Sequence, residues 1–244
     1  MKTHLSGSVS RTIMLAGAIA VAGLVLPASA MGQHRPIRGE FLLYADVAVP
    51  VGEFSDHVNL GGGGGIGGVL YLNAQRTAAL RAEGNFVIYG SDSYRAPLSP
   101  TVPFVDVDVR TTNSILSAGL GPQVYLGSGS LRPYFFGTVG FSYFVTETGV
   151  SGTNHDEEFA STTNFDDFNL ALAGGGGLSV EVRGGENPVS MDLSASYQHN
   201  GLTEYLTGGN ENLRRLPRGG WSASPILSDA NLMTYRAGVS IALR

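Results

Sequence analysis

The sequence predicts an all-β protein, an eight-stranded antiparallel up-and-down transmembrane β-barrel. Three observations predict this fold. Apolar residues alternate with small or polar residues at a period of two, which is the period of a strand and not of a helix. The connections between the alternating segments are short and long in strict turn. Charged residues make up only 14% of the chain, against about 25% in an ordinary soluble domain.

Residues 1–30 have the pattern of a secretory signal peptide. Lys2 and Arg11 form a positive start, residues 13–26 are apolar or small, and Ala28-Ser29-Ala30 is a small-x-small cleavage site. An N-terminal membrane anchor is the alternative. The apolar run of 14 residues is shorter than the roughly 20 that a spanning helix needs, so we expect an exported chain.

The expected mature chain has a short N-terminal segment at 31–38 and a barrel domain at 39–244. Within that domain five segments alternate cleanly. They are 41–49, 78–89, 168–183, 189–198 and 232–243. In each segment one parity is apolar, and the other is small, polar or charged. We expect the apolar parity to face outward and the other to face the interior, the reverse of a soluble barrel.

Three further segments are less regular. Residues 66–72 follow five consecutive glycines, residues 112–126 alternate only after Leu116, and residues 131–146 are apolar on both faces. Because Gly relieves crowding inside a narrow barrel, the glycines at 61–65 fit a barrel wall. A phosphate-binding loop would lead into a helix and, in the P-loop case, carry a Lys. This run leads into a strand without one, so we expect no nucleotide cofactor.

The connections sort by length. The short ones are 73–76, 127–130 and 184–188, and the long ones are 50–60, 90–107, 147–166 and 199–230. An outer-membrane barrel has short periplasmic turns and longer external loops, whereas a soluble β-sandwich has no reason to sort its loops this way. We therefore expect four external loops, with strand 41–49 pairing antiparallel with strand 232–243 to close the barrel.

The C-terminal strand carries a second signal. Arg236, Gly238, Ile241 and Leu243 have the spacing of the terminal-strand signal that the outer-membrane assembly machinery reads. With this signal the chain resembles the small bacterial outer-membrane β-barrel family, the OmpA/OmpX-type transmembrane barrel, over residues 39–244. The family usually ends on an aromatic residue, whereas this chain ends Leu243-Arg244. The resemblance implies a monomer in the outer membrane, in contact with lipid, lipopolysaccharide and the assembly machinery.

Composition excludes several other functions. The chain has no Cys, so it has no disulfide scaffold, thiolate metal site, Cys nucleophile or lipidated Cys anchor. It has 15 basic and 20 acidic residues, which is the wrong balance for a nucleic-acid partner. We expect no cofactor and no metal.

Eight charged residues fall on the predicted inward faces. They are Asp46, Arg81, Glu83, Arg132, Glu181, Arg183, Asp192 and Arg236. Four acids and four arginines balance, as a sealed structural network would require, because buried charges must pair. Side chains fill the interior of an eight-stranded barrel, so we expect a plug, with a pore or proton path as the alternative. Asp46 is expected near Arg236 inside the closing strands.

Other candidate sites lie near the loops. His199 at a strand end lacks a nearby following Ser, which a lipid-deacylating triad would need. His155 lies in an acidic loop that could hold a divalent cation, and Arg214, Arg215 and Arg218 could meet lipopolysaccharide phosphates.

The expected function is non-enzymatic, membrane-structural or surface interaction through the external loops, with no catalytic residues. The alternative is OmpW-like passage of small or hydrophobic solutes, which the inward aromatic residues Tyr134 and Phe136 would allow. A lipid-modifying enzyme is the third possibility.

The signal peptide gives a direct prediction. We expect residues 1–30 to be absent from the mature protein because the small-x-small site follows the apolar run at once. Sequencing the N-terminus of the membrane-extracted protein should begin near Met31. A mature chain that begins at Met1 would contradict the assignment.

Overall fold

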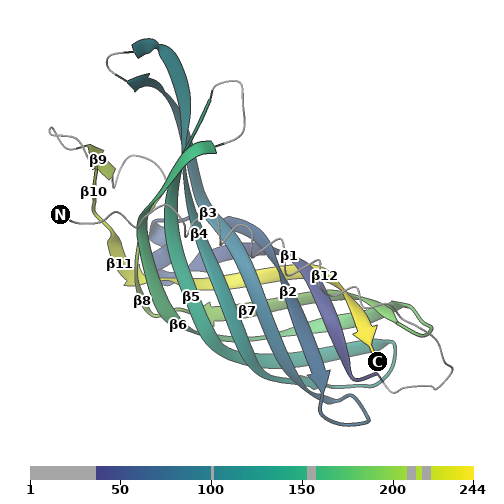
Figure 1. Cartoon of the computed structure of the whole chain (residues 1–244). Coiled ribbons are helices and arrows are strands. Elements are labelled where there is room, and N and C mark those ends of the chain that lie inside the picture. Colours follow the sequence, from purple (N-terminus) through teal and green to yellow (C-terminus); the bar gives the residue numbers. More distant parts are fainter. Residues whose placement is uncertain (1–36, 100–101, 153–157, 208–212, 216–220) are drawn as a thin grey trace, which may run out of the picture. The chain divides into compact units, whose positions relative to one another are not determined.

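Eight strands form a closed antiparallel barrel in the computed structural model (Figure 1). The barrel strands are β1 (Gly39–Val51), β2 (Gly61–Tyr71), β3 (Ala78–Ser99), β4 (Val102–Tyr125), β5 (Leu131–Gly152), β6 (Glu158–Arg183), β7 (Val189–His199) and β12 (Asn231–Leu243). Each strand pairs with its neighbour along the chain, and β12 pairs with both β7 and β1. The predicted up-and-down barrel is confirmed.

The structure describes residues 37–99, 102–152, 158–207, 213–215 and 221–244. The predicted signal peptide, His155 and Arg218 lie outside these residues. Among the described residues, no helix is long and apolar enough to cross a membrane.

Short elements accompany the barrel at its external end. A 3-10 helix, η1 (Gly52–Asp56), follows β1. β8 (Leu202–Tyr205) pairs with β11 (Ile226–Asp229), and β9 (Leu213–Arg215) pairs with β10 (Trp221–Ala223). The predicted long connections 50–60 and 199–230 therefore contain structure of their own.

Two other predicted loops are mostly strand. The sequence predicts long connections at 90–107 and 147–166, but β3, β4, β5 and β6 run through most of them. Cross-strand pairing continues outward to Ser99↔Val102 in one hairpin and to Ser151↔Glu158 in the other. The alternation fades in β3 after Gly90 and in residues 147–164, where most side chains are small or polar, although in β4 Val107 and Val109 still alternate with Asp108 and Arg110. Backbone pairing persists throughout.

Inward-facing glycines make room for large lumen side chains. β2 begins within the five-glycine run, at Gly61, and not after it. A Cβ on Gly65 would lie 2.7 Å from Cε2 of Tyr44, and a Cβ on Gly177 would lie 2.5 Å from the ring of Tyr134. Real Cβ atoms do not approach other atoms that closely, so these two glycines permit the two tyrosines.

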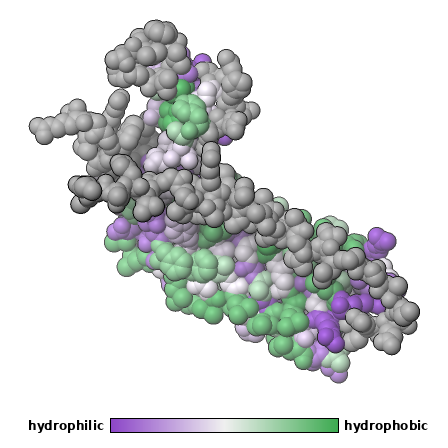
Figure 2. All heavy atoms as spheres, viewed as in Figure 1, coloured by the Kyte–Doolittle hydropathy of each residue, from purple (hydrophilic) through white to green (hydrophobic). Residues whose placement is uncertain are grey.

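The outward faces form an apolar belt. Large apolar side chains of every barrel strand are exposed, and hydrophobic residues lie along the visible wall of the barrel (Figure 2). The belt includes Leu43, Val47, Ile66, Leu70, Leu80, Phe86, Leu120, Val124, Phe135, Val139, Leu170, Leu172, Met191, Leu193, Val239 and Ile241. An exposed apolar patch of this extent requires a hydrocarbon environment. The predicted orientation, apolar outward, is confirmed.

The closed barrel leads to a second prediction. Because eight paired strands leave no free edge within the membrane, the folded protein should resist detergent at room temperature. On detergent gels the unheated protein should therefore migrate faster than the boiled protein. Equal mobility of the two samples would argue against a closed barrel.

Candidate functional site

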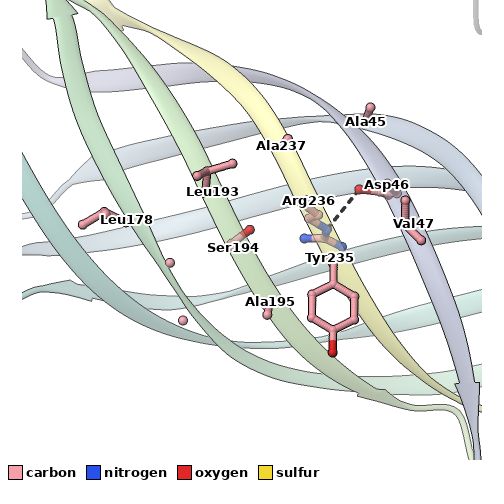
Figure 3. Close-up of a pocket in the computed structure, with 12 residues that line it drawn as sticks. Ala45, Asp46, Val47, Leu178, Leu193, Ser194, Ala195, Tyr235, Arg236 and Ala237 are labelled. Carbon is pink, nitrogen blue, oxygen red and sulfur yellow. Dashed lines mark ion pairs between the residues drawn. The ribbon is translucent and has the colours of Figure 1, made fainter.

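The centre of the lumen holds a charge layer, which we define as Asp46, Arg81, Glu83, Asp192 and Arg236. Strand alternation turns each of these side chains inward. β1 and β12 pair in a register that places Asp46 directly opposite Arg236, as the sequence predicts. The two side chains point toward each other across the seam between the first and last strands (Figure 3).

Glu83 joins the two arginines of this layer. Its Oε2 accepts hydrogen bonds from Arg81 Nε and from Arg236 Nη1, both at 2.7 Å. Arg236 Nε lies 3.4 Å from Asp46 Oδ1. Asn85 donates to Asp46 Oδ2 at 3.3 Å. One carboxylate thus links two strands that are distant in sequence, because β3 and β12 face each other across the lumen.

Aromatic rings border the charge layer on its periplasmic side. The guanidinium carbon of Arg236 lies 4.9 Å from the ring centre of Tyr44, and that of Arg81 lies 4.5 Å from the ring centre of Phe136. Both distances suit cation–π attraction. Arg81 Nη1 also donates to Gln123 Oε1 at 3.0 Å. Each arginine is therefore held by an acid on one side and a ring on another.

A second ion pair lies at the periplasmic end. Arg132 Nη2 donates to Glu40, and Tyr71 donates to the same carboxylate. Arg132 Nη1 donates to the Tyr71 hydroxyl at 2.7 Å, and its guanidinium carbon lies 4.6 Å from the ring centre of Tyr125. Arg132 therefore pairs outside the charge layer, with an acid that the sequence analysis did not include.

Two of the eight residues predicted to form the lumen network lie outside it. Glu181 and Arg183 fall on the inward parity of β6, but both are exposed near the turn to β7. They do not join the buried network because β6 has already reached the rim there. Glu40 is buried, with 5% of its surface exposed. The sequence indicates its burial in one way: Glu40 falls on the inward-facing set of alternate positions of the first strand. However, it lies one residue before the predicted start of that strand.

Asp192 is placed differently from the other acids. Tyr134 donates its hydroxyl to Asp192 Oδ1 at 2.7 Å. No arginine nitrogen among the described residues lies within 4.0 Å of this carboxylate.

A polar layer lies on the external side of the charges. Gln198 donates to Ser142 Oγ at 2.9 Å and to Asn200 Oδ1 at 2.9 Å. Ser142 and Ser117 share a hydrogen bond of 2.9 Å. A cavity of about 10 Å³ adjoins this layer beside Glu83, which is at the lower limit for a single water molecule.

An aromatic cluster closes the external mouth. Phe54 of η1 is fully buried, and its ring centre lies 4.9 Å from that of Tyr205, 5.6 Å from that of Tyr89 and 6.3 Å from that of Phe144. Burial raises the pKa of the Tyr205 hydroxyl, which shares a hydrogen bond of 2.8 Å with Ser228 Oγ. Buried side chains therefore occupy the lumen from the periplasmic ion pair to the external mouth.

The lipid-facing wall has a depression of about 580 Å³ over β1, β6, β7 and β12 (Figure 3). Its outward residues include Gly176, Ala45, Ala195 and Ala237, and larger side chains such as Tyr235 border it. The depression follows from the small outward side chains at these positions, and it faces hydrocarbon.

The remaining sequence candidates lie apart from the lumen. Exposed His199 shares a hydrogen bond of 2.8 Å between its Nδ1 and Asn231 Oδ1. Within the described residues, no three His, Asp or Glu side chains form a metal-binding group. Arg214 and Arg215 lie on β9.

The proposed assembly signal lies along β12. Ile241 and Leu243 are exposed on the outward face, at 44% and 47%. A Cβ on Gly238 would approach Tyr44 Cβ to 2.7 Å, so this glycine has a packing role in the folded barrel.

Comparison with known proteins bears on the fold. Neither a protein-family model nor a curated protein sequence matches the chain. Among solved structures it is similar to Neisserial surface protein A, with a TM-score of 0.50 and 13% identity over 84% of this chain and 97% of that one. The chain has the fold of a small outer-membrane β-barrel. The predicted resemblance is thus confirmed at the level of fold, and the apolar belt is that of a barrel whose outer wall faces lipid.

Two further solved structures show lower similarity. A major outer membrane protein from Thermus thermophilus has a TM-score of 0.48 and 11% identity, over 84% of this chain and 99% of that one. OprG from Pseudomonas aeruginosa has a TM-score of 0.45 and 13% identity, over 86% of this chain and 99% of that one.

The seam ion pair gives a third prediction. Removing either Asp46 or Arg236 leaves a buried charge with fewer partners, which should cost about 3 kcal/mol of unfolding free energy. Because Asp46→Ala and Arg236→Ala remove the same interaction, their effects should be non-additive by about 1–3 kcal/mol. Urea unfolding in detergent micelles measures this cycle.

The exposed pair Arg95–Asp108, at 3.2 Å with side chains 61% and 40% exposed, serves as the matched control. Its coupling should stay below about 1 kcal/mol. Additive effects at the seam would show that the buried pair has no energetic coupling.

Proposed function

We propose that this chain is a non-enzymatic, sealed outer-membrane barrel that binds proteins through its external strands. One observation carries the proposal: the pairing of β3, β4, β5 and β6 continues outward past the ends of β1 and β2 (Figure 1). We call the part of these four strands beyond Ile88 of β3 and before Leu172 of β6 the external sheet.

The external sheet is long enough to rise well above a membrane. The last pair between β2 and β3 is Gly62↔Ile88, and β3 continues to Ser99. At about 3.3 Å per residue, these further residues extend the strand by about 36 Å. A barrel that served only to span the membrane would not need strands of this length.

Side-chain hydrogen bonds order this sheet. Thr111 and Thr148 share a hydrogen bond of 2.8 Å across β4 and β5, and Asn164 of β6 donates to Thr148 at 2.6 Å. Arg95 Nε donates to Asp108 Oδ1 at 3.2 Å across β3 and β4. A surface ordered before binding loses less conformational entropy when a partner docks.

The β3 margin of the external sheet is an open edge among the described residues, because beyond Ile88 β3 pairs with β4 alone. Along the other margin β6 pairs before Leu172 with β5 alone, but Glu204 N of β8 donates to Asp167 Oδ2 at 2.9 Å, so β8 lies beside part of that edge. An open edge offers unpaired backbone N–H and C=O groups to an extended segment of another chain. The partner class that fits is therefore a protein with an accessible extended segment.

The filled lumen supports the sealed part of the proposal. Phe54, Arg81 and Tyr134 are all at most 1% exposed, at three levels of the barrel. This packing does not favour the alternative of OmpW-like solute passage. Lipopolysaccharide remains a proposed partner of the apolar belt. The outer-membrane assembly machinery remains a proposed partner of the terminal-strand signal on β12.

A shortened variant tests the binding role. Replacing residues 94–109 by Asn-Gly should close the β3–β4 hairpin directly after the pair Ser93↔Arg110. We expect peptides selected from a random library on the refolded protein to bind the shortened variant at least tenfold more weakly. The heat-modified gel shift, unchanged in the variant, controls for folding. Equal binding to both proteins would contradict a role for this hairpin.

The same preparation tests the seal. In a planar lipid bilayer, the refolded protein should give no discrete current steps, because buried side chains occupy the lumen. Regular steps would contradict the sealed barrel without bearing on the external sheet.

A further inference from the structure

The lumen contains one more carboxyl group than it has arginines. Seven charged side chains lie buried there, four acids and three arginines. They are Glu40, Asp46, Glu83, Asp192, Arg81, Arg132 and Arg236. The balance of four against four expected from the sequence fails because Glu181 and Arg183 are exposed, while Glu40 is buried. With every carboxyl ionised, the described lumen would carry a net charge of −1.

The ion pairs identify the excess group. Glu40 pairs with Arg132 at the periplasmic end. Glu83 contacts both remaining arginines, and Asp46 contacts Arg236. Asp192 alone among the four acids has no arginine within 4.0 Å in the described structure, although only 8% of its surface is exposed.

A buried carboxylate without a paired cation is costly, and such a group commonly takes up a proton instead. We propose that Asp192 is a neutral carboxylic acid in the folded barrel at neutral pH. The lumen then carries three carboxylates and three arginines, and its net charge is zero.

An unsatisfied hydroxyl lies beside Asp192. Ser179 lies directly opposite Asp192 in the β6–β7 pair. It is 1% exposed, and its Oγ has no hydrogen-bond partner among the described residues. Directly opposed side chains lie about 5 Å apart at Cβ. Because a serine hydroxyl accepts from a carboxylic acid as readily as it donates to a carboxylate, a neutral Asp192 can donate to Ser179 while its other oxygen accepts from Tyr134.

The surroundings favour a proton over a metal ion. The charged and titratable groups that face Asp192 are Tyr134 of β5, Arg81 of β3, Arg236 of β12 and Glu40 of β1. The two arginines oppose a proton and a metal cation alike, but Tyr134 and Arg81, each 1% exposed, fill the space beside the carboxyl that a metal ion and its ligands would need. A proton needs neither a cavity nor several ligands.

Protonation in the folded state makes stability depend on pH. The unfolded chain releases the aspartic proton near its ordinary pKa of about 3.9, whereas the folded barrel keeps it at neutral pH. Between a pH of about 4 and neutral pH the folded state therefore binds one more proton than the unfolded state, so the free energy of unfolding falls as the pH rises. Each proton lost on unfolding changes the unfolding equilibrium constant by about tenfold per pH unit.

Infrared spectroscopy of the refolded protein at pH 7 tests the proposal. We expect the C=O stretch of a protonated carboxyl group in the original protein and its loss in Asp192→Asn. Asp46→Asn is the matched control, since Asp46 lies in the same layer but contacts Arg236, and it should keep the band. Absence of the band from the original protein would overturn the proposal even if the variants do not fold, and its loss in Asp46→Asn alone would place the proton on Asp46.

Urea unfolding between pH 5 and 8 provides a second measurement. Asp192→Asn should remove about a tenfold dependence per pH unit from the unfolding constant. The titration is repeated with sodium replaced by choline at the same ionic strength. Unchanged stability supports the proton, whereas a loss of stability without sodium would show that a metal cation neutralises Asp192 and would overturn the proposal.

Discussion

An eight-stranded barrel encloses a space only about as wide as its own side chains, and no water layer hydrates the groups that point inward. Each large residue in the lumen therefore needs a small residue beside it, as Tyr44 needs Gly65 and Tyr134 needs Gly177. Each charged group likewise needs a partner, which is why Glu83 contacts two arginines. The composition of the barrel wall, rich in Gly, Ser and Ala, follows from this restricted volume.

Much of the barrel could be predicted from the sequence because the membrane imposes a strict alternation on every strand. Outward residues must be apolar, so the alternation of apolar and polar positions was enough to predict which side chains of β1, β3, β7 and β12 face the lumen. The extent of β3, β4, β5 and β6 could not be predicted in the same way. Outside the membrane neither face of a strand has to be apolar, so much of β3, β5 and β6 lacks a regular alternation there, and backbone pairing, as at Ser99↔Val102, marks the strand.

The sequence predicted which residues form the charge layer, but not all of the contacts between them. Parity and strand direction placed Asp46 beside Arg236, because these residues lie on neighbouring strands. They could not show that Glu83 reaches Arg236 from across the lumen, since that contact depends on barrel diameter and stagger. Stagger also decides which rim residues lie inside. It buries Glu40 and exposes both Glu181 and Arg183, so the lumen holds four acids and three arginines instead of four of each.

The seam between β1 and β12 joins the two ends of the barrel sequence, and it carries the buried contact between Asp46 and Arg236. Contacts between residues so distant along the chain form late in folding. Until the seam closes, both charges can remain hydrated, and closure must expel that water in a single step. Opening the seam again would require water to return to both charges. The barrel should therefore be kinetically trapped once inserted, with a lifetime set by the rate of seam opening more than by its equilibrium stability.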